Sequence, residues 1–93
     1  MTSLSAYAIF PIRNMKTVTN SVELGAAIRA ERKRLTVTQK ELAMAAGTGL
    51  RFLIELERGK PTSRIKGVFK VLQALGTKLA IGTKGAGEGA AVP

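Results

Sequence analysis

The sequence predicts an all-α protein, a small bundle of four to five helices followed by one short C-terminal strand. Three observations support this class. Apolar residues recur at helical spacing between Ile65 and Leu75. Thr38 and Glu41 have the spacing of a capping box, which marks a helix start. A glycine turn then separates two short apolar segments. The chain has 93 residues, so it holds one domain at most, and so small a core favours a dimer.

The pattern along the chain divides it into four segments. Residues 1–20 form an N-terminal extension and residues 21–76 form the helical domain. Residues 77–82 form a short strand, and residues 83–93 form a flexible tail rich in glycine and alanine.

The N-terminal extension contains an apolar stretch from Leu4 to Ile12. This stretch is too short to span a bilayer and lacks the preceding positive charge of a secretion signal, so we expect a cytoplasmic protein with no membrane partner. Tyr7, Ile9 and Phe10 fit either a short strand or an apolar contact. Met15 leaves a later translation start open.

A first helix is expected from Val22 to about Arg34, capped by Asn20 or Ser21. Its apolar residues recur at helical spacing and predict an inward face. Its basic end suits the negative helix C-terminus, and we expect a solvated face there, with phosphate contact as the alternative. The inward residues are Leu24, Ala27, Ile28 and Leu35, and the cations are Arg29, Arg32, Lys33 and Arg34.

The next two helices lie between Thr38 and Thr62. The capping box starts one helix at Gln39, and Gly47 ends it because glycine readily adopts the left-handed conformation. After a three-residue turn, a second helix runs from Leu50 to about Arg58. Two short helices with this spacing predict a helix-turn-helix, in which the second helix enters the major groove of DNA. A pair of ordinary core helices is the alternative. Leu53 and Leu56 are expected to face the core, whereas Leu50, Arg51, Ile54, Glu55 and Arg58 point elsewhere.

The last helix is amphipathic and ends at Gly76. Lys78 to Gly82 then alternates apolar and other residues, which predicts a brief strand that needs a partner strand for stability. The residues of the last helix expected in the core are Ile65, Val68, Phe69, Leu72 and Leu75.

Composition narrows the function. The chain has no Cys, His or Asp, which argues against a zinc finger, thiol chemistry and a Ser-His-Asp triad, so we expect no cofactor, no metal and no enzymatic activity. The glycine groups have neither phosphate-loop nor dinucleotide-binding spacing. A net charge of +9 supplies attraction to phosphates, although small charged proteins can also simply be soluble.

The motif segment contains Thr38-Gln39, Glu41-Leu42-Ala43, Ala46-Gly47 and Leu56-Glu57-Arg58-Gly59-Lys60. With these residues it resembles the helix-turn-helix of the phage-repressor (XRE) family. A narrower resemblance, to HipB-type antitoxins that partner HipA-type kinase toxins, rests on Arg51-Phe52, Glu55 to Thr62 and Val71 to Gly76. Together the resemblance covers about Val22 to Ile81.

The resemblance implies particular roles at particular positions. Residues at the start of the second motif helix face bases, and residues at the start of the first motif helix and after the second contact phosphates. Glu55 has a second possible role, which is to orient Arg51, and Phe52 either packs at the helix edge or contacts DNA. The base-contacting residues are Gly49, Leu50, Arg51 and Glu55; the phosphate-contacting residues are Thr38, Gln39, Arg58, Lys60 and Thr62, with Arg64 and Lys66 extending them; and the dimerisation residues are Leu79 and Ile81.

The expected function is a homodimeric repressor that binds double-stranded operator DNA. The narrower resemblance implies the antitoxin of a HipBA-type system, which regulates its own operon and binds a HipA-type kinase toxin. The alternatives are a stand-alone phage-type or metabolic repressor and a helix-turn-helix adaptor that bridges proteins.

Overall fold

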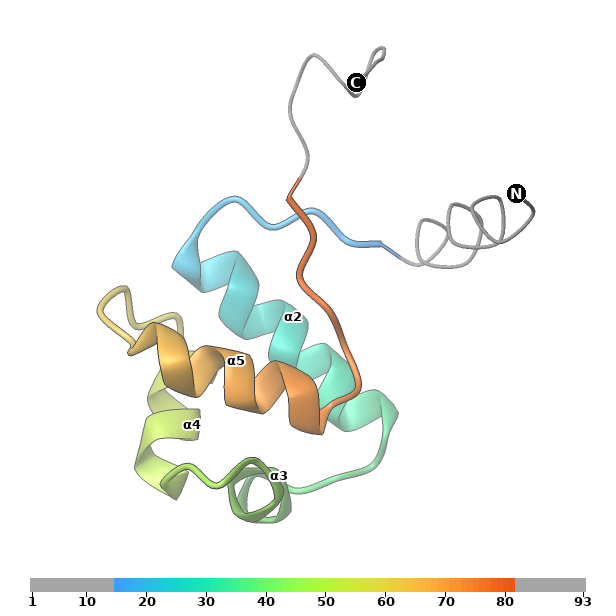
Figure 1. The fold of residues 1–93 in the computed structure, drawn as a ribbon, viewed down its shortest axis with the longest axis vertical. Helices are drawn as coiled ribbons and strands as arrows, with labels where there is room; N and C mark the ends of the chain where they lie inside the picture. The colour runs from blue at the N-terminus through green and yellow to red at the C-terminus, as the bar shows by residue number, and fades with distance from the viewer. Residues whose placement is uncertain (1–14, 82–93) are drawn as a thin grey trace, which may run out of the picture.

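The computed structural model describes residues 15–81, which contain four helices (Figure 1). None of these helices is long and apolar enough to cross a membrane. The predicted all-α class is confirmed. The predictions for the N-terminal apolar stretch and for the tail fall outside the described residues. The helices are α2 (Ser21–Arg34), α3 (Gln39–Ala46), α4 (Leu50–Glu57) and α5 (Ile65–Ala74).

Local signals place the helix ends where the sequence predicts them. Asn20, rather than Ser21, caps α2, and its side-chain oxygen accepts a hydrogen bond from the backbone N–H of Glu23 at 2.8 Å. In the capping box of α3, the Thr38 hydroxyl accepts from the Glu41 N–H at 3.0 Å, and the Glu41 carboxylate accepts from the Thr38 N–H at 2.9 Å. Gly47 ends α3 with a φ of +75°. Each of the two N-terminal caps stabilises its helix by about 1 kcal/mol.

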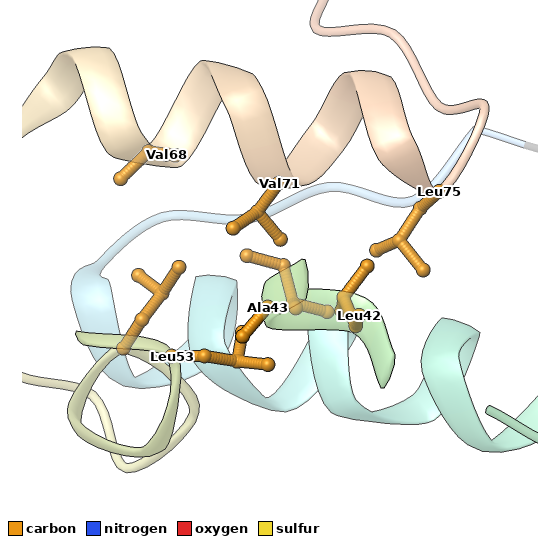
Figure 2. Close-up of a cluster of buried hydrophobic side chains, with 8 residues drawn as sticks. Leu42, Ala43, Leu53, Val68, Val71 and Leu75 are labelled. Atoms are coloured by element: carbon orange, nitrogen blue, oxygen red, sulfur yellow. The ribbon is translucent and has the colours of Figure 1, made fainter. Parts of the chain in front are cut away.

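The core lies where α3 and α4 meet α5, with α2 packed against α4 (Figure 2). The predicted inward residues of α4 are confirmed, since Leu53 and Leu56 are almost completely buried. Leu24, Val37, Ala46, Phe52 and Leu72 pack around the core as partly buried residues. The buried apolar residues are Ile28, Leu42, Ala43, Leu53, Leu56, Val68, Val71 and Leu75.

Three predicted core positions are wrong in the isolated chain. Ile65 and Phe69 of α5 are 66% and 44% exposed, and Leu35 is 38% exposed. The helix α5 is rotated so that Val68, Val71 and Leu75, spaced by three and four residues, face the core. That orientation leaves Ile65 and Phe69 on the outer side. Leu35 lies beyond the last turn of α2, at its C-cap.

The predicted strand is not tested by one chain. Residues 77–81 have no regular secondary structure, and Gly82 lies outside the described residues. The strand is predicted to pair with a strand of a second chain, so in a single chain it stays a prediction.

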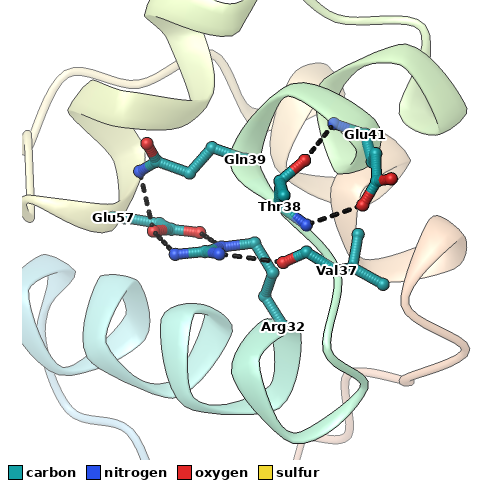
Figure 3. Close-up of polar contacts among 6 residues, drawn as sticks. All are labelled: Arg32, Val37, Thr38, Gln39, Glu41 and Glu57. Carbon is teal, nitrogen blue, oxygen red and sulfur yellow. Dashed lines mark hydrogen bonds and ion pairs between the residues drawn. The ribbon is translucent and has the colours of Figure 1, made fainter.

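A buried ion pair joins α2 to the end of α4 (Figure 3). The guanidinium of Arg32 donates from Nε to Glu57 Oε2 at 2.7 Å and from Nη2 to Glu57 Oε1 at 3.0 Å. Its Nη1 donates to the carbonyl oxygen of Val37 at 2.9 Å. The expected solvated position of Arg32 is therefore wrong, because its side chain is only 10% exposed.

Gly25 allows α2 to approach the backbone of α4 closely. A Cβ atom at this position would lie 2.8 Å from the carbonyl oxygen of Glu57 and closer still to that of Leu56. These atoms belong to a helix backbone, which cannot move aside without shifting α4. The position of α4 relative to α2 therefore depends on a residue without a side chain at position 25.

Replacing Gly25 with Ala is expected to destabilise the fold. Alanine normally stabilises a helix interior by about 1 kcal/mol over glycine, but overpacking costs about 1–3 kcal/mol, and here the clash is with backbone. We expect Gly25→Ala to lower the free energy of unfolding in urea by about 1–2 kcal/mol. A variant more stable than the wild type would show that the two helices are free to separate.

Breaking the buried ion pair is expected to cost more than breaking an exposed one. In Glu57→Gln the buried guanidinium loses its counter-charge, and we expect a loss of about 3 kcal/mol in the free energy of unfolding. The matched control is Glu31→Gln, which removes a surface pair with Arg34 and should cost less than about 1 kcal/mol. Equal losses in thermal or urea unfolding would contradict a structural role for the Arg32–Glu57 pair.

Candidate nucleic-acid interface

The outer face of α4 brings several predicted DNA contacts together. Leu50, Arg51, Ile54, Glu55 and Arg58 border one shallow surface depression. The side chain of Arg51 is 89% exposed. The helix is held from behind by Leu53 and Leu56, so its outer face is presented on a rigid support. This face offers a guanidinium fork, apolar contact area and one carboxylate, which are the groups that read base edges.

A second depression lies beside this face and is strongly basic. We call it the basic groove and define it by its charged lining residues: Arg51, Glu55, Lys60, Arg64, Lys66 and Lys70. Gly49 and Thr62 also line it, so predicted base contacts and predicted phosphate contacts meet there. Five cations against one carboxylate suit an anionic ligand such as a phosphodiester strand.

Phe52 and Gly67 also line the basic groove and pack on each other. Phe52 is partly buried against the core, and a Cβ atom at Gly67 would lie 2.5 Å from its ring carbon Cζ. Of the two readings of Phe52, the structure therefore supports packing at the helix edge. The contact ties α4 to α5, the helix that carries Lys66 and Lys70.

Glu55 makes two ion pairs within the basic groove. Its carboxylate accepts a hydrogen bond from Lys60 Nζ at 3.0 Å and one from Arg51 Nε at 3.4 Å. The hydrogen bond and positive charge of Lys60, followed by those of Arg51, lower the pKa of Glu55 below its usual value. The carboxylate is therefore charged at neutral pH, and its bond with Arg51 fits the second possible role of Glu55, which is to orient Arg51.

The start of α3 carries the other predicted phosphate contacts. The Thr38 hydroxyl accepts from the Glu41 N–H, so its own hydrogen can still be donated to a phosphate oxygen. Gln39 donates from Nε2 to Glu57 Oε1 at 3.0 Å (Figure 3), which connects this helix start to the buried ion pair. The second hydrogen on that amide nitrogen remains for a phosphate.

The remaining predicted residues lie elsewhere. Arg58 is exposed at the end of α4 and borders the first depression, not the basic groove. Leu79 and Ile81 follow α5, are 55% and 92% exposed, and border neither depression. A single chain does not test the predicted role of these two residues in a dimer.

Sequence reasoning missed three features of this region. Arg32 follows Ile28 by four residues and so shares its inward stripe, a signal that was available. Lys70 follows Lys66 by four residues, which would have placed it on the same side of α5. The bond between Lys60 and Glu55 had no comparable signal because it spans the end of a helix.

The Helix-turn-helix family matches residues 28–81. The uncharacterized HTH-type transcriptional regulator y4mF of Sinorhizobium fredii (strain NBRC 101917 / NGR234) is 46% identical over 66 residues, which cover 71% of this chain and 87% of the relative.

Solved structures show the same fold. A chain of the HipB-O4 20mer complex matches with a TM-score of 0.71 and 21% identity, over 75% of this chain and 99% of that chain. A chain of the HipA-HipB-O2-O3 complex matches with the same score, identity and coverage. At this identity the likeness establishes the arrangement of the helices. Together with the family match and the relative, it shows that this chain belongs to the XRE-type helix-turn-helix family of DNA-binding transcriptional regulators.

Proposed function

We propose that this protein is a sequence-specific repressor that binds an inverted-repeat operator as a homodimer. The observation that carries the proposal is the position of Arg51, which is almost fully exposed on the outer face of α4 and borders the basic groove. A rigid helix therefore presents a base-reading group next to a surface suited to phosphates. Family membership supports the class of ligand, and this geometry supports the proposed roles of the residues.

Arg51 is proposed to read a guanine. Its planar fork matches the O6 and N7 acceptors of guanine in the major groove, a pairing worth about 1–3 kcal/mol of discrimination. Leu50, which is 42% exposed, can contact a thymine methyl group. Apart from Gly49 itself and its two chain neighbours, no heavy atom of the described residues lies within 4 Å of an added Cβ at this position, which leaves its backbone open to a close approach of DNA.

Phosphate contacts are proposed to position α4 without reading sequence. They come from two sides of the outer face of α4, which is the arrangement needed to hold a helix in the major groove. One side is the start of α3, where the free amides of the first turn and the helix dipole favour an anion. The other side follows α4. The residues are Thr38 and Gln39 on the first side and Arg58, Lys60 and Thr62 on the second, with Arg64 and Lys66 beyond them.

The homodimer is proposed to form through Leu79 and Ile81. Both apolar side chains are exposed in the single chain, and an isolated strand of this length needs a partner strand. Two copies related by a twofold axis would place two α4 helices about 34 Å apart, on one side of an inverted repeat.

We further propose that the protein is the antitoxin of a HipBA-type system. The support is the HipB-like arrangement of the helices, which is found in a chain of a HipA-HipB-O2-O3 complex. The proposed partner is a HipA-type kinase toxin, and the proposed operator is the promoter of the protein's own operon. Bringing two repressor dimers together through such a partner would strengthen repression.

Co-expression with the neighbouring genes tests both proposals. The chain is purified by affinity, and its binding to its own upstream DNA and to a scrambled duplex is measured over a range of salt concentrations. Recovery of a kinase-like partner together with selective binding supports the antitoxin-repressor. Selective binding alone supports a stand-alone repressor. Equal binding to both duplexes contradicts sequence-specific repression and favours an adaptor.

Arg51→Ala is expected to reduce selectivity more than general affinity. Loss of the guanine contact should weaken binding to upstream DNA by about fivefold to 150-fold, which corresponds to about 1–3 kcal/mol. Arg51→Lys is the matched control, because it keeps the charge but loses the planar fork, and it should bind scrambled DNA like the wild type while losing most of the preference. If Arg51→Ala keeps the full preference in fluorescence anisotropy titrations, Arg51 does not read bases.

Ile81→Lys is expected to weaken the dimer without unfolding the chain. The side chain is 92% exposed in one chain, so a charge there costs little unless a second chain covers it. Sedimentation equilibrium should show a shift toward monomer, with unchanged helix content by circular dichroism. Met44→Lys, at a 74% exposed position on α3, is the control and should leave the dimer intact. An unchanged dimer in Ile81→Lys would move the interface away from this segment.

A further inference from the structure

Glu55 is the one carboxylate among the charged residues that line the basic groove in the described part of the chain. It engages two cations at once, Lys60 at 3.0 Å and Arg51 at 3.4 Å. The side chains of all three residues are solvent-accessible, with exposed fractions of 34% for Glu55, 46% for Lys60 and 89% for Arg51. Ion pairs this exposed contribute little to folding. Their position at the proposed DNA surface therefore calls for another explanation.

The two ion pairs compete with phosphate binding. Lys60 Nζ is a compact charge, so a phosphate oxygen and the Glu55 carboxylate are alternative partners for it. If Lys60 turns to a phosphate, the Glu55 carboxylate loses its strongest partner and faces a polyanion. Like charges brought together in this way oppose binding. A duplex that is held only through its backbone is therefore repelled by the Glu55 carboxylate.

A guanine contact by Arg51 avoids part of this cost. The bond from Arg51 to Glu55 uses Nε, and within the described residues the two terminal nitrogens Nη1 and Nη2 make no hydrogen bond. These terminal nitrogens can bond O6 and N7 of guanine while Nε keeps its contact with Glu55. A cognate base therefore lets the ion pair persist, whereas a backbone-only contact of Arg51 would pull the guanidinium away from Glu55.

We infer that Glu55 is a specificity-determining residue that acts against non-cognate DNA, because its charge opposes the phosphate contacts of Lys60 and Arg51, whereas a guanine contact leaves the bond between Arg51 and Glu55 in place. This inference rests on the proposed function. Selectivity of this kind comes from a repulsive group that penalises the wrong ligand, in addition to contacts that favour the right one. The carboxylate acts as an internal stand-in for a phosphate group.

The test is Glu55→Gln, which keeps the shape of the side chain and removes its charge. Affinity for a scrambled duplex is expected to rise by about threefold or more at 0.15 M salt, because at least one cation becomes free to neutralise a phosphate. Each phosphate neutralised in this way releases a counterion from the DNA. The slope of log K against log salt should steepen by about 1 for the same reason. Affinity for the upstream DNA should rise less, so that the ratio between the two duplexes falls.

The matched control is Glu31→Gln, which makes the same change in net charge. Glu31 also pairs with an arginine, Arg34 Nη2 at 2.6 Å, but it does not line the basic groove. It should raise the affinity for scrambled DNA by less than Glu55→Gln. An equal rise in both variants would mean that net charge alone is responsible, and that result would overturn the inference. So would a Glu55→Gln variant with wild-type affinity and salt slope on scrambled DNA.

A second background shows whether Glu55 acts through Lys60. In Lys60→Gln, the effect of adding Glu55→Gln on scrambled DNA should fall to less than half of its size in the wild type. An effect of full size would overturn the proposed action through Lys60. Failure of the proposed function is read separately, from a wild-type protein that does not distinguish upstream from scrambled DNA.

Discussion

The bidentate ion pair between Arg32 and Glu57, together with Gln39, joins α2 to the two helices of the helix-turn-helix. Arg32 belongs to α2, Glu57 ends α4, and Gln39 at the start of α3 donates to the same carboxylate. The side chain of Glu57 is only 3% exposed, so its charge must be satisfied by these partners. Since α3 and α4 form the helix-turn-helix, this one carboxylate helps to fix the angle at which both helices face a duplex.

The short helix α4 separates folding from recognition on its two sides. Leu53 and Leu56 bury one side in the core, and Gly25 lets the backbone of α2 reach the end of the same helix. The opposite side carries Leu50 and Arg51, which contribute little to the core. Changes on this outer side can therefore alter the ligand without changing the fold, which is how one fold comes to serve many binding sites.

The positions of the charged side chains are more informative about function than the net charge. The net charge of +9 predicts attraction to polyanions, but the same charge would be compatible with a merely soluble protein. The structure gathers Lys60, Arg64, Lys66 and Lys70 on one groove beside α4 and places Glu55 among them. A groove that attracts phosphates and contains an internal competitor is suited to selective binding, because its attraction is restrained where no base contact is made.

The sequence by itself determined the helices and the helix-turn-helix, because their signals are local. The caps at Asn20 and Thr38, the left-handed Gly47 and the spacing of Leu53 and Leu56 all act within one or two turns of the chain. The outward-facing residues of α4 could also be predicted from the sequence, since helical spacing separates them from Leu53 and Leu56. Tertiary structure alone decided which side of α5 is buried, leaving Ile65 and Phe69 outside, and it decided that Arg32 is buried against Glu57. It also brought Lys60 back onto Glu55. These outcomes depend on how helices cross and how the chain turns after α4, and no spacing within a single helix encodes that geometry.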